Sequence, residues 1–271
     1  MNKGNFSVLL SIYIKTDVFQ LTECINSIEK QSLLPSEIIL IVDGPISFDV
    51  DLLVNRYKSL KFEIIRNKFN LGLPLSLNKG LNKCKYEIVF RIDSDDICLH
   101  NRFEIQFEKF NKNSKLAVLG TNVILIDNKS CQIKKERKMP LSNSDIRKIL
   151  PFKNPFNHPS VVYKKSIILS VGGYSNVYLY EDWYLWFKLS KLNNIEFENI
   201  NEKLIKYRIR QFDDRKGFKI IKAEANFYFL LLKNKHINIL YFIFNVSIKF
   251  CVRFMPSPIY VYIKTKFDLI K

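Results

Sequence analysis

Residues 89–96 read VFRIDSDD, so a β-favouring apolar run that begins at Tyr86 leads directly into three carboxylates. If this run is a buried strand, alternation points Asp93 and Asp95 the same way where the strand leaves the sheet. Two neighbouring carboxylates repel each other, so a fold keeps both only with a counter-charge, most simply a divalent cation that holds a phosphate. The alternative is an acidic turn, or the N-cap of a helix predicted over residues 102–110.

The segment before this stretch alternates strands with helices. Apolar, β-rich runs at residues 6–13, 37–42 and 62–66 predict three buried strands. Apolar residues at helical spacing predict a helix between each pair of strands, the first broken at residues 34–36 and the second spanning 52–60. This order favours an α/β fold with right-handed βαβ units and a mixed, mainly parallel sheet flanked by helices.

Polar side chains fall where the predicted strands end. In open sheets of parallel strands, ligands bind beyond the carboxyl ends of the strands. The side chains at those ends are Ser11, Tyr13, Asp43, Asp93 and Asp95. We therefore expect a ligand site at this edge. The sequence has neither G-x-G-x-x-G after the first strand nor a Walker loop, which disfavours a Rossmann dehydrogenase and a P-loop NTPase.

A loop and a short helix are predicted over residues 70–81. Gly72 and Gly80 either let the backbone approach a ligand or serve as turn and cap residues, and the sequence leaves both readings open. After the acidic stretch, residues 116–126 predict a pair of strands, and Asp127-Asn128-Lys129 predicts a hairpin-like turn.

Two further polar clusters follow. A polar loop at residues 154–160, which contains two prolines, precedes a predicted strand at 161–163. A predicted helix then opens on Glu181 and Asp182, and acidic residues suit the positive end of a helix dipole whether or not they have another role. The aromatic residues that come next, beginning with Trp183, are expected mostly in the core.

The composition limits the partners. A net charge of +17 over 271 residues predicts attraction to nucleic acid, to a lipid surface or to a phosphorylated substrate. The basic residues are spread along the chain and match no nucleic-acid-binding motif, so nucleic acid is not expected as a partner. Five cysteines without a C-x-x-C pair indicate a reducing compartment, and with three histidines they argue against a structural zinc site.

From Phe218 the pattern becomes helical, apolar and basic. The longest uncharged run there, residues 237–248, is too short to span a bilayer. Apolar faces flanked by Lys and Arg suit helices that lie in a membrane interface against anionic lipid, and they equally suit a helical lid packed on the domain. We therefore divide the chain into a domain at 1–215 and a helical, basic and apolar extension at 216–271.

Taken in order, the motifs resemble those of the family 2 glycosyltransferases of the GT-A fold. The likeness is to inverting bacterial enzymes that build O-antigen and exopolysaccharide repeat units, such as amylovoran, on a lipid carrier. It covers roughly residues 6–215 and rests on SIY, VDGP, NLGLPLSLNKGL, RIDSDD, NPFNHPSV, GGY and EDWYLWFKL. Many relatives have two acids and then Gly-Ser after the second strand, whereas this chain has Asp43-Gly44-Pro45.

The resemblance implies roles for particular residues. Tyr13 would stack on the nucleotide base, Asp43 would hydrogen-bond it, and Asp93 would lie near the ribose. Asp95, together with Asp93, would hold Mn²⁺ or Mg²⁺, with Asp96 and Arg91 in support, and Asp182 would be the catalytic base. The remaining implied residues are Glu181 beside the base, Ser11, Asn70, Asn78 and Arg91 at the nucleotide sugar, and His158, Trp183, Arg208 and Arg210 at the acceptor.

The implied function is that of an inverting, metal-dependent glycosyltransferase in O-antigen, capsule or exopolysaccharide biosynthesis. It would move a hexose, with galactose or glucose favoured and a β1,3 linkage taken from relatives, from a UDP-sugar to an undecaprenyl-diphosphate-linked sugar. It would work as a peripheral protein on the cytoplasmic face of the bacterial inner membrane, held to an anionic surface by the C-terminal helices. The alternative is a catalytically inactive relative that acts as a membrane scaffold in a polysaccharide assembly complex.

Overall fold

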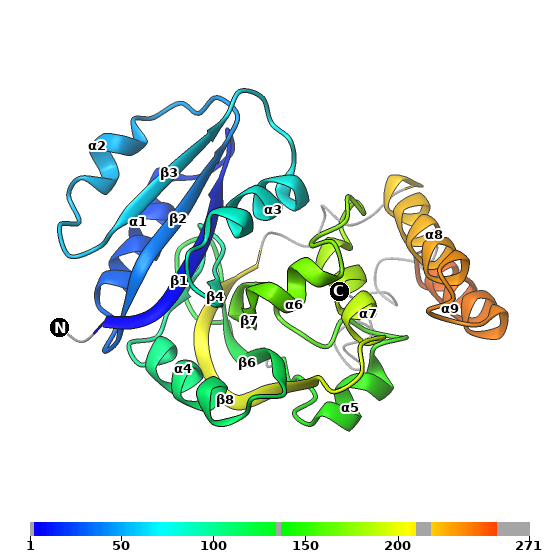
Figure 1. Cartoon of the computed structure of the whole chain (residues 1–271). Coiled ribbons are helices and arrows are strands. Elements are labelled where there is room, and N and C mark those ends of the chain that lie inside the picture. Colours follow the sequence, from blue (N-terminus) through cyan, green and yellow to red (C-terminus); the bar gives the residue numbers. More distant parts are fainter. Residues whose placement is uncertain (1–2, 134–136, 210–217, 254–271) are drawn as a thin grey trace.

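The computed structural model describes residues 3–133, 137–209 and 218–253, whose arrangement Figure 1 shows. The strands are β1 (Lys3–Ile12), β2 (Leu34–Asp43), β3 (Phe62–Asn67), β4 (Ile88–Arg91), β5 (Ile97–Cys98), β6 (Leu116–Ile126), β7 (Val162–Lys164) and β8 (Glu196–Arg208). The helices are α1 (Val18–Glu29), α2 (Val50–Val54), α3 (Leu73–Lys83), α4 (Arg102–Lys112), α5 (Asn143–Ile149), the 3-10 turn η1 (His158–Ser160), α6 (Lys165–Ser170), α7 (Glu181–Leu189), α8 (Phe218–Lys233) and α9 (Ile239–Arg253).

One sheet runs through the molecule in the strand order β3-β2-β1-β4-β7-β6-β8-β5. β1 pairs in parallel with β2 and β4, and β2 pairs in parallel with β3. β7 pairs antiparallel with both β4 and β6, so it connects this parallel half to β6 and β8, which are parallel to each other. The predicted mixed, mainly parallel sheet flanked by helices is confirmed.

Apolar cores lie on both faces of the sheet. Alternate residues of β1 face opposite ways, so Val8 and Leu10 join the core beneath α1, α2 and α4. Leu9, between them, joins the core beneath α3, α6 and α7. β1 is therefore central, with both faces covered and both edges paired, and its carboxyl end opens beside that of β4 at one edge of the sheet (Figure 1).

A predicted pair of strands is one strand, and a predicted break lies inside another strand. Residues 116–126 form the single strand β6 and not a pair, because Gly120 at its centre admits a close neighbour: a Cβ there would lie 2.2 Å from Oδ1 of Asn199 on β8. Residues 34–36 open β2, since a proline is tolerated near the start of a strand, and Pro35 lies level with Gly4 of β1.

One helix end and one strand also differ from the sequence-based prediction. α2 ends at Val54 and not at residue 60, because the chain turns there to bring Tyr57 and Leu60 into the core. β8 was not predicted. The three consecutive exposed residues 201–203 interrupt its alternation of buried and exposed positions, so its sequence lacks a period of two.

The first C-terminal helix, α8, belongs to the core of the molecule. The Phe227 ring stacks on Tyr180 with centroids 4.7 Å apart and lies 4.9 Å from the ring of Trp183 on α7. α8 therefore packs on the domain, as expected for a helical lid, which was one of the two alternatives. α9 lies beside α8 (Figure 1). The predicted division between residues 215 and 216 lies outside the described residues. Among the described helices, none combines the length and the apolar character that a membrane span needs.

Candidate active site

Three carboxylates gather where the chain leaves β4. Asp93, Asp95 and Asp96 each place one oxygen within 4.8 Å of the others. The N–H of Asp96 donates to the carbonyl oxygen of Asp93 over 3.2 Å, which folds the stretch into a turn. α4 begins only at Arg102, with Asn101 at its N-cap position, so the carboxylates do not cap that helix. The clustering predicted from the strand pattern is present.

Arg91, the last residue of β4, is a buried cation behind these carboxylates. Its guanidinium forms an ion pair with Asp93. Burial lowers the pKa of Arg91, but the charge and hydrogen bond of Asp93, together with Tyr174 and Asp96, raise the pKa above its ordinary value. Arg91 therefore stays charged and supports Asp93 from inside the protein, in keeping with the supporting role that the resemblance implies; its contact with the nucleotide sugar stays a prediction.

Asp96 forms the buried side of the cluster. Its Oδ1 accepts the backbone N–H of Arg208 over 2.8 Å, and its Oδ2 has no hydrogen-bond partner among the described residues. Burial, together with the charges of Asp95 and Asp93, raises the pKa of Asp96 well above its usual range. A buried carboxylate oxygen without a donor, beside two further carboxylates, fits a cation site. Such all-oxygen donor sets suit Mg²⁺ and Mn²⁺.

Arg208 holds the carboxylate stretch in place. Its buried guanidinium donates to the carbonyl oxygens of Asp95 and Asp127 over 2.8 and 2.7 Å and pairs with Glu23 over 2.9 Å. These contacts turn the side chain inward, so we assign Arg208 a structural role in place of the predicted acceptor contact. Arg210, the other arginine predicted at the acceptor, lies outside the described residues.

Asp43 ends β2 and organises the loop before α3. Its Oδ1 accepts the N–H of Leu71 over 2.8 Å and the side-chain amide of Asn67 over 3.0 Å. Its Oδ2 accepts the N–H of Gly72 over 3.0 Å, and Gly72 has the positive φ that glycine tolerates best. Each carboxylate oxygen has two lone pairs, so Oδ2 keeps one that a nucleotide base could use.

Ser11, Tyr13 and Asn70 lie at the same edge of the sheet. The last pair in the register of β1 and β2 joins residues 12 and 42, so Tyr13 and Asp43 follow it side by side. Tyr13 and Thr16 exchange two hydrogen bonds of 2.9 Å, which close a turn and leave the Tyr13 ring half-buried. Asn70 Nδ2 donates to the carbonyl oxygen of Asp43 over 3.2 Å. This arrangement is compatible with the predicted base contacts.

Asn78 connects α3 to the glycine turn that precedes α7. Its Nδ2 donates to the carbonyl oxygen of Tyr174, and its Oδ1 accepts the N–H of Tyr174, both over 2.7 Å. Gly173 lies against this amide, where a Cβ would come within 2.3 Å of Asn78 Oδ1. We therefore assign Asn78 to holding the turn in place of the predicted sugar contact.

Asp182 lies buried in the first turn of α7, with Glu181 half-buried before it. Its Oδ2 accepts Nδ2 of Asn154 over 2.6 Å, and its Oδ1 accepts the N–H of Trp183 over 2.8 Å. Asn154 Oδ1 accepts the N–H of Phe156 over 3.2 Å, which fixes the orientation of the amide. These donors and the helix N-terminus favour the ionised carboxylate, which is the form that a general base needs.

His158 and Tyr174 form a buried pair close to Asp182. Nε2 of His158 lies 3.0 Å from the hydroxyl oxygen of Tyr174. Burial, and then the neighbouring Tyr163, raise the pKa of Tyr174 well above its ordinary value; Asp182 adds to this rise and Arg91 opposes it. The Tyr174 phenol is therefore close enough to feel the charges of both Arg91 and Asp182.

Trp183 is a core residue. Its Nε1 donates to the carbonyl oxygen of Leu150 over 2.9 Å, and α8 covers its ring, so we assign it to packing in place of the predicted acceptor contact. Sequence reasoning missed Asn154 and Tyr174 as site residues. Both stand in motifs that had been noticed, NPFNHPSV and GGY, but their partners lie on other segments of the chain.

The family model described as "Glycosyl transferase family 2" matches residues 7–168. The chain belongs to glycosyl transferase family 2. Two relatives match this family 2 chain over nearly its whole length. It is 34% identical over 266 residues to the amylovoran biosynthesis glycosyltransferase AmsE of Erwinia amylovora, covering 96% of this chain and 98% of the relative. It is 36% identical over 270 residues to the UDP-Gal:alpha-D-GlcNAc-diphosphoundecaprenol beta-1,3-galactosyltransferase of Escherichia coli, covering 96% and 95%. The chain is therefore a glycosyltransferase relative of polysaccharide-building enzymes.

Solved structures of the S. aureus protein TarS share the fold. The fragment 1–349 in complex with UDP matches with a TM-score of 0.63 at 16% identity, covering 84% of this chain and 66% of that fragment. The same fragment in complex with UDP-GlcNAc gives a TM-score of 0.62. At this identity the likeness concerns the fold alone, and it agrees with the predicted GT-A fold of this family 2 chain.

Proposed function

We propose that this chain is an inverting hexosyltransferase that uses a UDP-sugar as donor and an undecaprenyl-diphosphate-linked sugar as acceptor. We take galactose or glucose as the hexose and β1,3 as the linkage. The name of the E. coli relative, a galactosyltransferase that acts on GlcNAc-diphosphoundecaprenol, supports this choice. The pathway would be the synthesis of O-antigen, capsule or exopolysaccharide.

The observation that carries the proposal is the shared neighbourhood of two acidic groups. The carboxylate stretch after β4 is anchored on Arg91, and Asp182 lies in the first turn of α7, 86 residues after Asp96 (182 − 96). Tyr174 feels the charges of both Arg91 and Asp182. A cluster of carboxylates that could hold a cation, with a buried, hydrogen-bonded carboxylate in the same neighbourhood, suits a displacement between two diphosphate-linked substrates.

In the proposed reaction, the acceptor hydroxyl oxygen attacks the anomeric carbon and gives its proton to Asp182 as the bond to the UDP oxygen breaks. Asn154 and the N–H of Trp183 hold the Asp182 carboxylate in place for this transfer. Asp93 and Asp95 would hold Mn²⁺ or Mg²⁺, which neutralises charge on a diphosphate leaving group when bound. Arg91 and Arg208 fix these two residues from inside the protein.

The proposed function also implies a cellular location. A lipid-linked acceptor lies at a membrane, and a net charge of +17 favours an anionic surface. We therefore assign the chain to the cytoplasmic face of the bacterial inner membrane as a peripheral protein.

The test is sugar transfer by the purified full chain to a synthetic GlcNAc-diphosphate-lipid acceptor. A panel of UDP-hexoses is offered with Mn²⁺, with Mg²⁺ and with EDTA. We expect transfer from one donor, loss of transfer in EDTA, and a product of inverted anomeric configuration. No transfer from any donor, combined with no metal-dependent binding of UDP, would contradict the proposal and favour a scaffold without activity.

A further inference from the structure

α9 has an apolar face that no other described element covers. Leu240 is 73% exposed, and Ile243 and Phe244 are each 54% exposed. These positions and Ile248 are three or four residues apart, so they form one stripe along the helix. Residues 239–248 contain no charged side chain. A continuous exposed apolar face of this kind usually marks a site of contact with a protein or a membrane.

The opposite face of α9 is fixed to the enzyme. Phe242 and Val246 pack against the core that contains α7 and α8. On one flank of the stripe, the ring of Phe152, which follows α5, lies 5.3 Å from that of Tyr241 and 6.5 Å from that of Phe244. The stripe is therefore held outward by packing on its reverse side.

α8, its neighbour, differs. Its exposed apolar residue is Phe229, and the positions on the same side of the helix are Lys222, Asn226 and Lys233. The apolar stripe belongs to α9 and does not continue onto α8.

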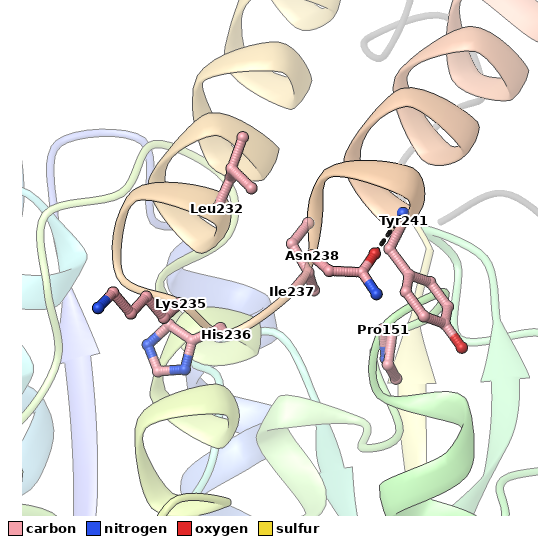
Figure 2. A pocket seen from close by; sticks show the side chains of 7 residues that line it. All are labelled: Pro151, Leu232, Lys235, His236, Ile237, Asn238 and Tyr241. Carbon is pink, nitrogen blue, oxygen red and sulfur yellow. Dashed lines mark hydrogen bonds between the residues drawn. The ribbon is translucent and has the colours of Figure 1, made fainter.

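The sequence of α8, α9 and the turn between them is basic. Along α8, α9 and the turn between them, the basic residues are Lys219, Lys222, Lys233, Lys235, Lys249 and Arg253. The acidic one is Glu224, which is buried. Figure 2 shows Lys235 at the turn between the two helices, beside a pocket of about 510 Å³ that Pro151 and Tyr241 also line. Apolar side chains that enter the acyl boundary, with cations around them, are the features by which helices bind anionic bilayers.

The stripe is also connected to the predicted base. Pro151 and Phe152 contact the α9 region, and two residues further on Asn154 donates to Asp182. A bilayer seated on α9 would therefore lie beside the segment that positions the proposed base.

We propose that the outward face of α9 is the surface by which this protein lies on an anionic bilayer, while α8 remains part of the enzyme core. The inference rests on the proposed function, because that function requires a lipid-linked acceptor. It goes further in assigning the contact to one face of one helix.

The test is co-sedimentation of the full chain with vesicles of phosphatidylcholine, with and without phosphatidylglycerol. Wild type should bind the vesicles that contain phosphatidylglycerol. The double variant Leu240→Glu/Ile243→Glu should bind them at least about tenfold more weakly, since it places two charges in the stripe. Leu52→Glu is the matched control: Leu52 is 61% exposed on α2, at the opposite end of the molecule (Figure 1), and its substitution should leave binding unchanged.

Three results would overturn the inference. Wild type fails to bind either vesicle, or the double variant binds as well as wild type, or light scattering shows a dimer that the double variant dissociates, which would assign the stripe to a second copy of the chain. Transfer to a water-soluble, short-chain acceptor separates this test from the proposed function. Both variants should keep that activity, whereas its absence in wild type would count against the function and leave the vesicle result standing. Unchanged melting temperatures confirm that the variants fold.

Discussion

The side-chain amide of Asn154 donates a hydrogen bond of 2.6 Å to Oδ2 of Asp182, which stands 28 residues later in the chain. Phe156 N–H occupies the other end of the amide, so Nδ2 cannot turn away from Asp182. Asn154 thus positions the proposed base. Asn154→Ala should lower kcat by about tenfold to a hundredfold, because a hydrogen bond to a charged group contributes about 1.5–3 kcal/mol. Since that donor favours the ionised carboxylate, the acidic limb of the kcat/KM profile should move to higher pH.

Asn157→Ala is the matched control for this prediction. Asn157 lies in the same loop and is equally buried, but its Nδ2 donates to the carbonyl oxygen of Thr121 over 3.0 Å. The Asn157→Ala substitution should lower stability and leave the acidic limb of the kcat/KM profile in place. Both variants keep Glu181 and Tyr174, two other titratable groups near the proposed base, so these groups do not account for a difference between the profiles. Identical pH profiles for the two variants would show that Asn154 has only a structural role.

The contacts of Arg208 predict a large contribution to stability. Arg208→Ala removes the donors to the carbonyl oxygens of Asp95 and Asp127 and leaves Glu23 without its buried partner. Breaking a buried pair in this way should lower the free energy of unfolding by about 3 kcal/mol, measured by urea denaturation. Arg66→Ala, which removes an exposed pair with Asp51, should cost less than about 1 kcal/mol. Equal losses would refute the assignment.

Two phenylalanines on α8 test whether that helix belongs to the core. Phe227 is fully buried against Tyr180 and Trp183, so Phe227→Ala should lower the free energy of unfolding by about 3–5 kcal/mol. Phe229, two residues later, is 58% exposed, and Phe229→Ala should change stability by about 0.5 kcal/mol or less. A small effect at both positions would mean that α8 is not packed on the domain in solution.

His236, at the turn between α8 and α9, predicts a pH dependence of stability. Burial, with Lys191 and Lys188 nearby, lowers its pKa from 6.5 to about 4. The unfolded chain therefore takes up this proton at a higher pH than the folded protein does. Its contribution to stability should fall as pH drops below 6.5 and level off below about 4. His236→Gln should remove this component, so the difference in unfolding free energy between wild type and variant should decline over that range. A difference that stays constant with pH would contradict the assignment.

The parts of the fold that could be predicted from the sequence are those that depend on short-range sequence patterns. The runs that became β1 and β2 are mostly apolar, because both faces of the sheet are covered there. The clustering of Asp93 and Asp95 was predicted from strand alternation, but β4 ends at Arg91 and a turn closed by the N–H of Asp96 brings the carboxylates together. The acidic opening of α7 followed from a helical pattern that begins on two carboxylates. Each feature depends on neighbours within a few residues.

The roles that the sequence assigned differently depend on partners far along the chain. Asn78 and Tyr174 meet across 96 residues, and Arg208 and Asp95 meet across 113. A motif shows that an asparagine or an arginine stands near a site, but the tertiary fold decides whether the side chain turns toward a ligand or toward the backbone. Trp183 is a similar case, because α8, which covers its ring, begins 35 residues later (218 − 183).

The most direct test of the central claim is to compare Asp182→Asn with wild type in UDP binding and in sugar transfer. The substitution keeps the size of the side chain but removes the group that accepts the proton. The account predicts that metal-dependent UDP binding stays within about threefold of wild type, since the uridine and metal residues are untouched, while kcat falls by about 10²- to 10⁴-fold. Transfer by Asp182→Asn at the wild-type rate would contradict the account, because another group would then have to be the base.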